Sequence, residues 1–215
     1  MRQTVVFLFL CTLAAGEIID RVAVSAGNHT VTESEIRRYL RFAAFFGQRE
    51  PDMSPEARRI AADRLIDQAL IGREIELAGY TPPSMAEIET RIVDWRKRRS
   101  QTEADFQKAL QRYGFTEEDL KREVQWQLTV IRFIDFRFRP GVQVSDEEVA
   151  EFYKKEFPQW LEKRGRPREP VPPLEEARSE ITETLAEIKV TAAMEQWLAQ
   201  ARQQTPVRYR EASFK

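Results

Sequence analysis

The chain has 215 residues, of which 34 are basic and 35 acidic, so its formal net charge is −1. This balance argues against a nucleic-acid binder, which usually carries a strong basic excess. A single histidine and a single cysteine exclude ordinary zinc, haem and iron–sulfur sites. With 42% hydrophobic residues and only eight glycines, the composition fits a helical protein with solvated faces, organised as one domain or two small ones.

Residues 1–16 have the pattern of a secretory signal peptide. Arg2 supplies the positive start, Val5 to Leu10 is an apolar run, and residues 14–16 are small enough for cleavage. A retained membrane anchor is the alternative, but the run is shorter than the roughly 20 residues that span a bilayer. Cleavage would remove Cys11. We therefore expect a soluble, exported, periplasmic chain that is held together by its core without disulfides.

The exported part begins with a predicted hairpin. Residues 18–26 are rich in β-prone side chains, and Gly27-Asn28 is a turn signal after which Thr30-Val31 can return as a second strand. The only histidine, His29, falls at this turn, and we interpret it as a solvated turn residue.

Six helix starts follow. Most have a hydroxyl residue at the cap and an acid three positions later, whose side chains satisfy free backbone N–H groups. These pairs are Thr32…Glu35, Ser84…Glu87, Thr102…Asp105, Thr116…Asp119 and Ser145…Glu148, and Ser54-Pro55 adds a start with proline at the first helical position. The predicted helices span about 33–46, 55–79, 85–99, 103–113, 117–138 and 146–157, with a seventh at 174–204.

The helix over 117–138 is the most apolar. An apolar stripe recurs every three or four residues, and aromatic side chains widen it until the second half is apolar nearly all round. Such a helix is either central in the fold or exposes a surface for a ligand.

The end of the chain is expected to return to its beginning. The helix over 174–204 carries apolar residues on one face, from Leu174 to Leu198, and residues 206–210 alternate apolar and charged side chains as an edge strand does. The first hairpin has no other partner in the sequence. The expected fold is therefore mainly α, with a small antiparallel sheet made of the N-terminal hairpin and the C-terminal strand.

The sequence offers little for catalysis. Acidic clusters such as Glu117-Glu118-Asp119 sit in first helical turns, where the helix dipole favours them. The basic run over 91–99 surrounds Trp95 at a helix C-terminus, and we interpret it as a solvated helix end rather than a nucleic-acid patch. No phosphate-binding glycine loop is present. We expect no catalytic residue, no metal site and no cofactor.

A surplus of aromatic residues remains. Aromatics bring large apolar area at low entropy cost, which suits a groove for unfolded peptides; the alternative is that they are core residues. The candidate peptide-binding residues are Phe42, Phe45, Phe46, Trp126, Phe133, Phe136, Phe138 and Trp160.

Several segments together resemble a known family. They are residues 20–24 and 32–36 at the start, 65–71, the run 106–121 with its Tyr113-Gly114-Phe115 turn, 144–153, and the late helix through Trp197-Leu198. In these segments the chain resembles the SurA-type periplasmic chaperones, which are related to PrsA-like and PpiD-like foldases. The resemblance implies a helical chaperone domain over 17–157 that is completed by 174–215.

The resemblance also implies a function. Relatives insert parvulin-type prolyl isomerase modules where this chain has only residues 158–173, which we expect to be a linker too short for a folded unit. Isomerase residues have no positions here, so the expected protein is an ATP-independent holdase and not an enzyme. The implied partners are unfolded or nascent exported polypeptides, such as outer-membrane β-barrel precursors, and peripheral association with the membrane assembly machinery is also implied. The alternatives are a dedicated non-catalytic assembly or adaptor partner of one exported protein, and a family member labelled a prolyl isomerase without the catalytic module.

Overall fold

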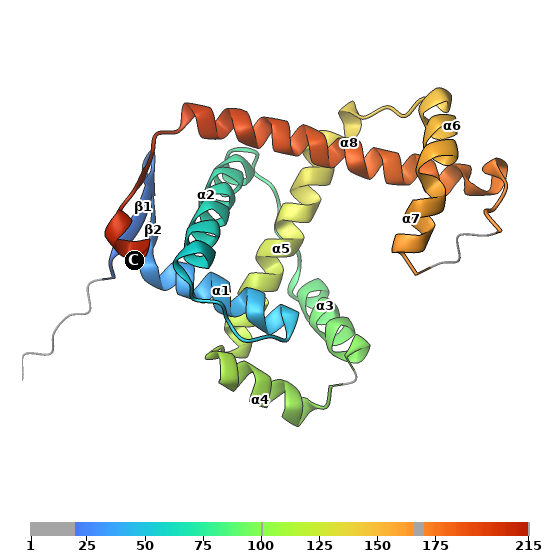
Figure 1. Cartoon of the computed structure of the whole chain (residues 1–215). Helices are drawn as coiled ribbons and strands as arrows, with labels where there is room; N and C mark the ends of the chain where they lie inside the picture. Colours follow the sequence, from blue (N-terminus) through green and yellow to red (C-terminus); the bar gives the residue numbers. More distant parts are fainter. Residues whose placement is uncertain (1–19, 100, 166–169, 215) are drawn as a thin grey trace, which may run out of the picture.

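A computed structural model describes residues 20–99, 101–165 and 170–214; the expected signal peptide at 1–16 lies outside them. In this part of the chain a small sheet and eight α-helices form a helical body from which a long arm extends (Figure 1). The helices are α1 (Glu33–Gly47), α2 (Pro55–Leu77), α3 (Met85–Arg98), α4 (Glu103–Tyr113), α5 (Glu117–Phe138), α6 (Asp146–Lys155), α7 (Phe157–Lys163) and α8 (Leu174–Gln204). Two 3-10 turns, η1 (Arg139–Gly141) and η2 (Glu211–Phe214), complete the elements with the strands β1 (Val22–Ala26), β2 (His29–Thr32) and β3 (Val207–Tyr209).

The helix starts are where the capping pattern predicts them. At Thr32, Ser84, Thr116 and Ser145 the cap hydroxyl accepts a backbone N–H while the acid three residues later accepts the cap's own N–H. At Thr102 the hydroxyl accepts the backbone N–H of Asp105, and the Asp105 carboxylate accepts from that hydroxyl and not from the Thr102 backbone. Short-range hydrogen bonds of this kind depend on neighbouring residues alone, which is why the sequence locates them.

The end of the chain pairs with its beginning, as expected. The sheet order is β2-β1-β3, and β3 runs antiparallel to β1, with Ser25 opposite Arg208 and Ala26 opposite Val207. Beyond β3, η2 places the Phe214 side chain in the core cluster formed by the sheet and the first two helices, where it packs with Val24 and Ile66.

Polar side chains fasten this closure to α2. Arg202, near the end of α8, donates to Asp67 at 2.5 Å and to the backbone oxygen of Asp63 at 2.6 Å. The Tyr209 hydroxyl donates to the carboxylate of Asp63. Burial of the phenol, followed by this bond to an acceptor, raises the pKa of Tyr209 to about 12, so the hydroxyl keeps its proton at physiological pH.

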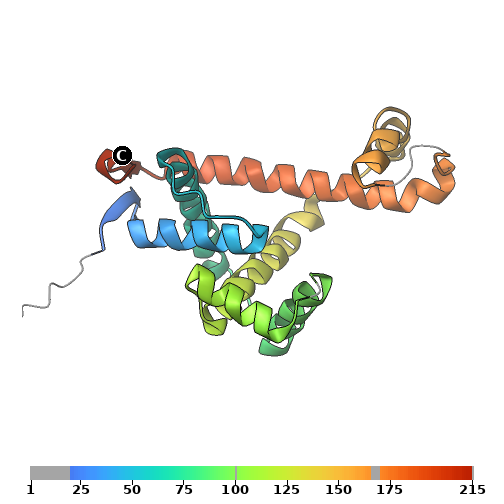
Figure 2. The ribbon, with the colours of Figure 1, turned by 60° about the horizontal axis from the view of Figure 1, so that its bottom comes forward.

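The arm is α8 itself. Its 31 residues extend about 46 Å at 1.5 Å per residue, and Figure 2 shows it as one straight rod between the body and a smaller lobe. The expected apolar face is divided between these two parts. Ala177 and Ile181 pack in the lobe and Leu198 packs against the body, whereas Ile188 between them is 51% exposed.

The lobe, which consists of α6, α7 and the first half of α8, has its own core. Phe157 and Leu161 of α7 are buried against α6 and α8. The segment 158–173 therefore differs from the expected linker, because its residues Pro158 to Lys163 belong to α7. Proline suits the first turn of a helix, and the spacing of Phe157 and Leu161 places both on one buried face.

Replacing Phe214 with alanine should lower the free energy of unfolding by about 3 kcal/mol, because it leaves a cavity under the sheet that joins the two chain ends. Urea unfolding followed by circular dichroism measures the loss. The control is Arg208→Ala, which alters an exposed residue of β3 and should change stability by less than about 0.5 kcal/mol. Equal losses in the two variants would show that the terminal turn does not contribute to the core.

Asp119 gives the fold a pH dependence. It accepts the backbone N–H of Thr116 at 2.9 Å, Arg122 at 2.7 Å and Arg38 of α1 at 2.9 Å. The Thr116 bond and the neighbouring arginines hold the pKa of this carboxyl well below its usual value of 3.8. Because the folded-state pKa is depressed, the stabilisation is complete above the unfolded-state pKa and is lost as pH falls through the folded-state pKa.

Asp119→Asn should therefore lower the free energy of unfolding by about 1–2 kcal/mol at pH 7. The difference in this free energy between the variant and the native chain should be smaller at pH 3. Urea unfolding at both pH values measures this. Asp94→Asn, at an exposed aspartate of α3 without an ion pair in the described part of the chain, is the matched control and should show no such difference. A gap that stays constant between pH 7 and pH 3 would contradict the assignment.

Candidate peptide-binding surface

The candidate aromatic residues of α1 mostly belong to the core. Phe42 and Phe45 are buried, and the Phe42 ring stacks on Phe115 with centroids 3.8 Å apart. Phe46 is half-buried at the edge of the same cluster and meets Trp95 edge-on at 5.9 Å. Of these three side chains, only Phe46 has surface available to a ligand.

The aromatic residues of α5 divide in the same way. Phe133 is 1% exposed and packs against the α2 face that carries Ile71 and Ile75. Phe136, one helical turn later, is 67% exposed and lies 6.2 Å from the ring of Tyr80. Trp126 and Phe138 are half-buried.

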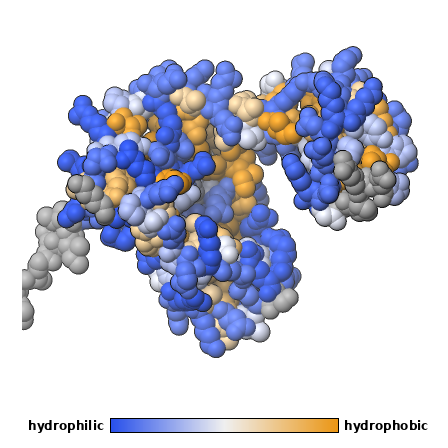
Figure 3. All heavy atoms as spheres, in the orientation of Figure 1, coloured by the Kyte–Doolittle hydropathy of each residue, from blue (hydrophilic) through white to orange (hydrophobic). Residues whose placement is uncertain are grey.

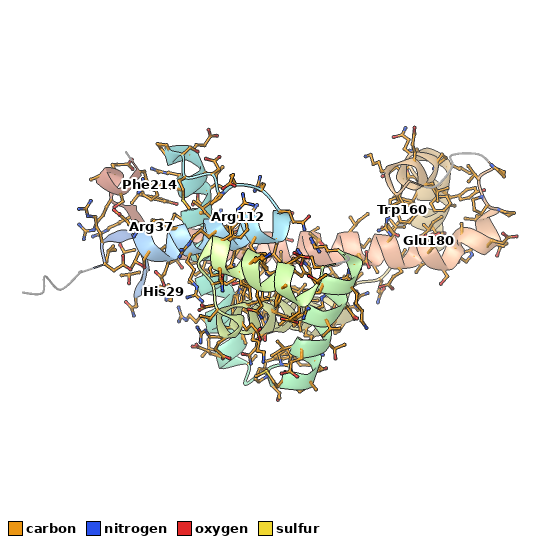
Figure 4. All side chains as sticks on the ribbon, turned by 90° about the horizontal axis from the view of Figure 1, so that it is seen from below. His29, Arg37, Arg112, Trp160, Glu180 and Phe214 are labelled. Carbon is orange, nitrogen blue, oxygen red and sulfur yellow. The ribbon has the colours of Figure 1, made fainter. Side chains whose placement is uncertain are left out.

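Trp160 lies away from the others. It is half-buried in the lobe, where it stacks on Phe157 at 5.6 Å and lies under the Arg164 guanidinium. Figure 4 shows it at the opposite end of the molecule from His29. The eight candidate residues therefore do not line one groove. Six of them are distributed among three separate clusters, and Phe136 and Phe138 lie outside these, beside Tyr80 and Trp197.

A wide cleft with a volume of about 870 Å³ lies between the hairpin turn, α2, α5 and the end of α8. One face of α2 forms a wall, on which the small residues Ala69 and Gly72 leave space. Trp126 of α5 contributes the largest aromatic surface, and its ring lies close to Gly72. His29 lines this cleft and is exposed to solvent as expected, but it is the first residue of β2, directly after the turn at Gly27-Asn28, and not a turn residue.

The cleft lining alternates apolar and polar groups. Leu65, Leu70 and Pro206 are interspersed with amide side chains, of which Gln68 and Gln204 are the nearest to them in sequence. Its ionisable side chains are Glu35, Glu76, Glu123, Arg73 and His29. Of the candidate aromatics, only Trp126 lines this cleft. The α2 residues of the cleft are absent from the candidates drawn from the sequence, because a helix face with small and amide side chains has no strong sequence signal. Gly72 inside a long helix is the one feature that could have indicated it.

A second, smaller hollow lies between α3, α5 and the end of α1, with a volume of about 100 Å³. Its apolar lining includes Phe46, Ile92 and Trp95, and Leu128 and Ile131 come from α5. The basic run over 91–99 is a helix end as predicted: Arg99 lies over the Trp95 ring at 4.2 Å and donates to the Phe46 carbonyl at 3.0 Å. We call this hollow the α3–α5 groove.

Large apolar side chains also remain in contact with solvent. Ile131 and Phe136 on α5 and Ile188 on α8 are each more than half exposed. Figure 3 shows hydrophobic atoms gathered over α5 and its neighbouring helices, and again where α8 meets the lobe. Apolar side chains gathered on a surface in this way are candidates for an interaction site.

The described residues contain no group of three or more histidine, cysteine, aspartate or glutamate side chains that could hold a metal ion. Over the same ranges, no helix combines the length and the apolar character needed to cross a membrane. No known family model matches the sequence, and no curated protein matches it.

The two phenylalanines of α5 should respond differently to replacement. Phe133→Ala should cost about 3–5 kcal/mol of unfolding free energy, because its ring fills the contact between α5 and α2. Phe136→Ala, at the same residue type one turn away, should cost less than about 0.5 kcal/mol. Urea unfolding of both variants measures the contrast, and a large loss from Phe136→Ala would show that this ring is part of the core.

Proposed function

We propose that the protein is an ATP-independent chaperone that holds unfolded, aromatic-rich polypeptides and so prevents their aggregation. The observation that carries the proposal is the wide cleft of about 870 Å³, which is bounded by elements from both ends of the chain. Its volume is within the range of sites that enclose a ligand, and it is open to solvent.

The lining suits an unfolded chain whose sequence is not fixed. An extended polypeptide presents unpaired N–H and C=O groups at every residue, and these require partners when water is excluded. Side-chain amides such as Gln68 and Gln204 can donate and accept, so they can serve any backbone. Trp126 and Leu65 offer apolar surface to whichever side chains the client presents.

The exposed apolar residues outside the cleft would add further weak contacts. Many such contacts together give binding in the micromolar range, about −8 kcal/mol. Affinity of this order competes with aggregation by mass action on the unfolded client and still allows release. The activity requires no reactive group, and on this proposal the protein is not an enzyme.

The proposed setting is the periplasm, with outer-membrane β-barrel precursors among the clients. Support comes from the signal-peptide pattern of residues 1–16, from the lack of cysteine after Cys11, and from the segments that resemble SurA-type chaperones. The pairing of β3 with β1, which brings the two ends of the chain into one domain, agrees with that resemblance.

The test is suppression of aggregation, measured by light scattering, with an unfolded barrel protein and an unrelated unfolded protein as clients. Ala69→Trp fills the cleft and should raise the concentration needed for half-suppression about tenfold, which corresponds to roughly 1.4 kcal/mol of binding. Ala86→Trp, at an exposed alanine of α3 outside the cleft, is the matched control and should behave as the native chain does.

Unchanged suppression by a folded Ala69→Trp variant would rule out the cleft as the client site. Activity toward one client and none toward the other would replace the general chaperone with a dedicated partner of a single protein. Prolyl isomerisation above the uncatalysed rate would overturn the proposal that the protein is not an enzyme.

A further inference from the structure

The α3–α5 groove lies on a different side of α5 from the wide cleft. The cleft takes Glu123 and Trp126 from α5, whereas the groove takes Val124, Gln127 and Ile131. At 100° per residue the mean directions of these two sets are roughly a quarter-turn apart. An occupant of one hollow therefore need not contact the other, and an inference about the groove does not depend on the function of the cleft.

The groove combines an apolar floor with a purely basic rim. Trp95 stacks on the buried Phe45 ring at 5.2 Å, so the floor is fixed by the core beneath it. Arg91 and Arg98 line the rim, and both are exposed. No aspartate or glutamate lines the groove. Its only uncharged polar lining residue, Gln127, donates to Glu123, which lines the wide cleft.

These two rim arginines form no salt bridge and no side-chain hydrogen bond with any residue in the described part of the chain. Their neighbours on α3 and just beyond it are engaged: Arg96 pairs with Glu103 at 2.7 Å, and Arg99 covers Trp95. Asp94 is the nearest carboxylate on α3, but it is exposed outside the groove. The guanidinium groups that border the apolar floor are thus the ones free to bind a ligand.

The spacing of the two arginines defines what could bind them. Seven residues are two helical turns, so Arg91 and Arg98 lie on one side of α3 about 10.5 Å apart along its axis. A second helix lying alongside α3 repeats this spacing between its own residues i and i+7. Its residues i+3 and i+4 then face the floor between them. A hollow of about 100 Å³ has room for roughly one apolar side chain, since a cavity of about 150 Å³ holds a benzene.

We propose that the α3–α5 groove is a docking site for an acidic amphipathic helix of a partner protein. The helix places an apolar side chain on Ile92, Trp95 and Leu128, and a carboxylate on each of Arg91 and Arg98. Docking of an apolar helix face into a hydrophobic groove is a recurrent mode of peptide recognition. The guanidinium fork adds geometric selectivity for carboxylates, because it can donate two parallel hydrogen bonds.

Fluorescence anisotropy with a labelled helical peptide tests the inference on the purified full chain. The peptide carries glutamate at positions i and i+7 and leucine and phenylalanine at i+3 and i+4, in an alanine-rich background. Two control peptides carry lysine at both glutamate positions, or serine at both apolar positions. The glutamate peptide should bind, and each control should bind at least about tenfold more weakly.

A charge-swapped protein makes the test specific. The double variant Arg91→Glu with Arg98→Glu should bind the glutamate peptide about tenfold more weakly than the native chain does, and it should bind the lysine peptide more tightly. Lys97→Glu makes the same change on an exposed residue of α3 outside the groove, and it should alter binding less than twofold. Both arginines are exposed, so the double variant should keep the native circular dichroism spectrum and melting temperature.

Three outcomes would overturn the inference. They are equal binding of the glutamate and lysine peptides, an equal effect of Lys97→Glu, and sedimentation showing that the native chain is a dimer while the double variant is a monomer, which would place a second copy of this chain on the groove. Suppression of aggregation by the Ala69→Trp variant is a separate readout. The proposal for the groove and the proposal for the cleft can therefore fail independently of each other.

Discussion

The fold depends on one long-range interaction, the pairing of β3 with β1. Residues 207–209 come back to residues 24–26, and Phe214 is then buried beneath the strands that begin the described chain. Closing so long a loop costs conformational entropy, although the cost rises only slowly with length. Hydrogen bonds of the ladder, the buried Phe214 ring and the bonds of Arg202 to Asp63 and Asp67 offset it. Because α8 leads directly into β3, this closure also fixes the direction of the arm and one wall of the wide cleft.

The rest of the helical body is arranged around α5, which lies at its centre. One side of this helix packs on α3 and α1, and another meets α2 and α8. The α3–α5 groove lies at the first of these contacts, and the wide cleft lies between α5 and α2. Its near-continuous apolar sequence left two interpretations open, a central helix or a ligand surface. The structure shows a central helix that also exposes apolar side chains: Phe133 is buried, while Ile131 and Phe136 are exposed.

The local features of the sequence predicted the helices well, because capping side chains and apolar periodicity act over a few residues. The closure of the sheet was also predictable, since an alternating tail with no other partner had one hairpin to join. The residues of the candidate site could not be predicted in this way. Burial of Phe42 but not Phe46, or of Phe133 but not Phe136, is decided by which helix lies opposite, and residue type and spacing do not encode that. The helix α7 was missed for a related reason, since a short helix with Phe157 and Leu161 on one face depends on the lobe that buries it.

The proposed binding surfaces use the half-buried aromatic side chains of the same clusters whose fully buried side chains form the core. Trp95 and Phe46 rest on Phe45, and Trp126 belongs to the cluster that is centred on Phe133. A ring held from below by core packing has few rotamers to lose when a ligand arrives, so less of the interaction energy is spent on ordering the surface. Packing the inner ring also keeps the outer ring from collapsing into the interior and sealing the hollow. On the two proposals made above, stability and binding would draw on the same aromatic clusters, which would account for the large number of aromatic residues on α1 and α5.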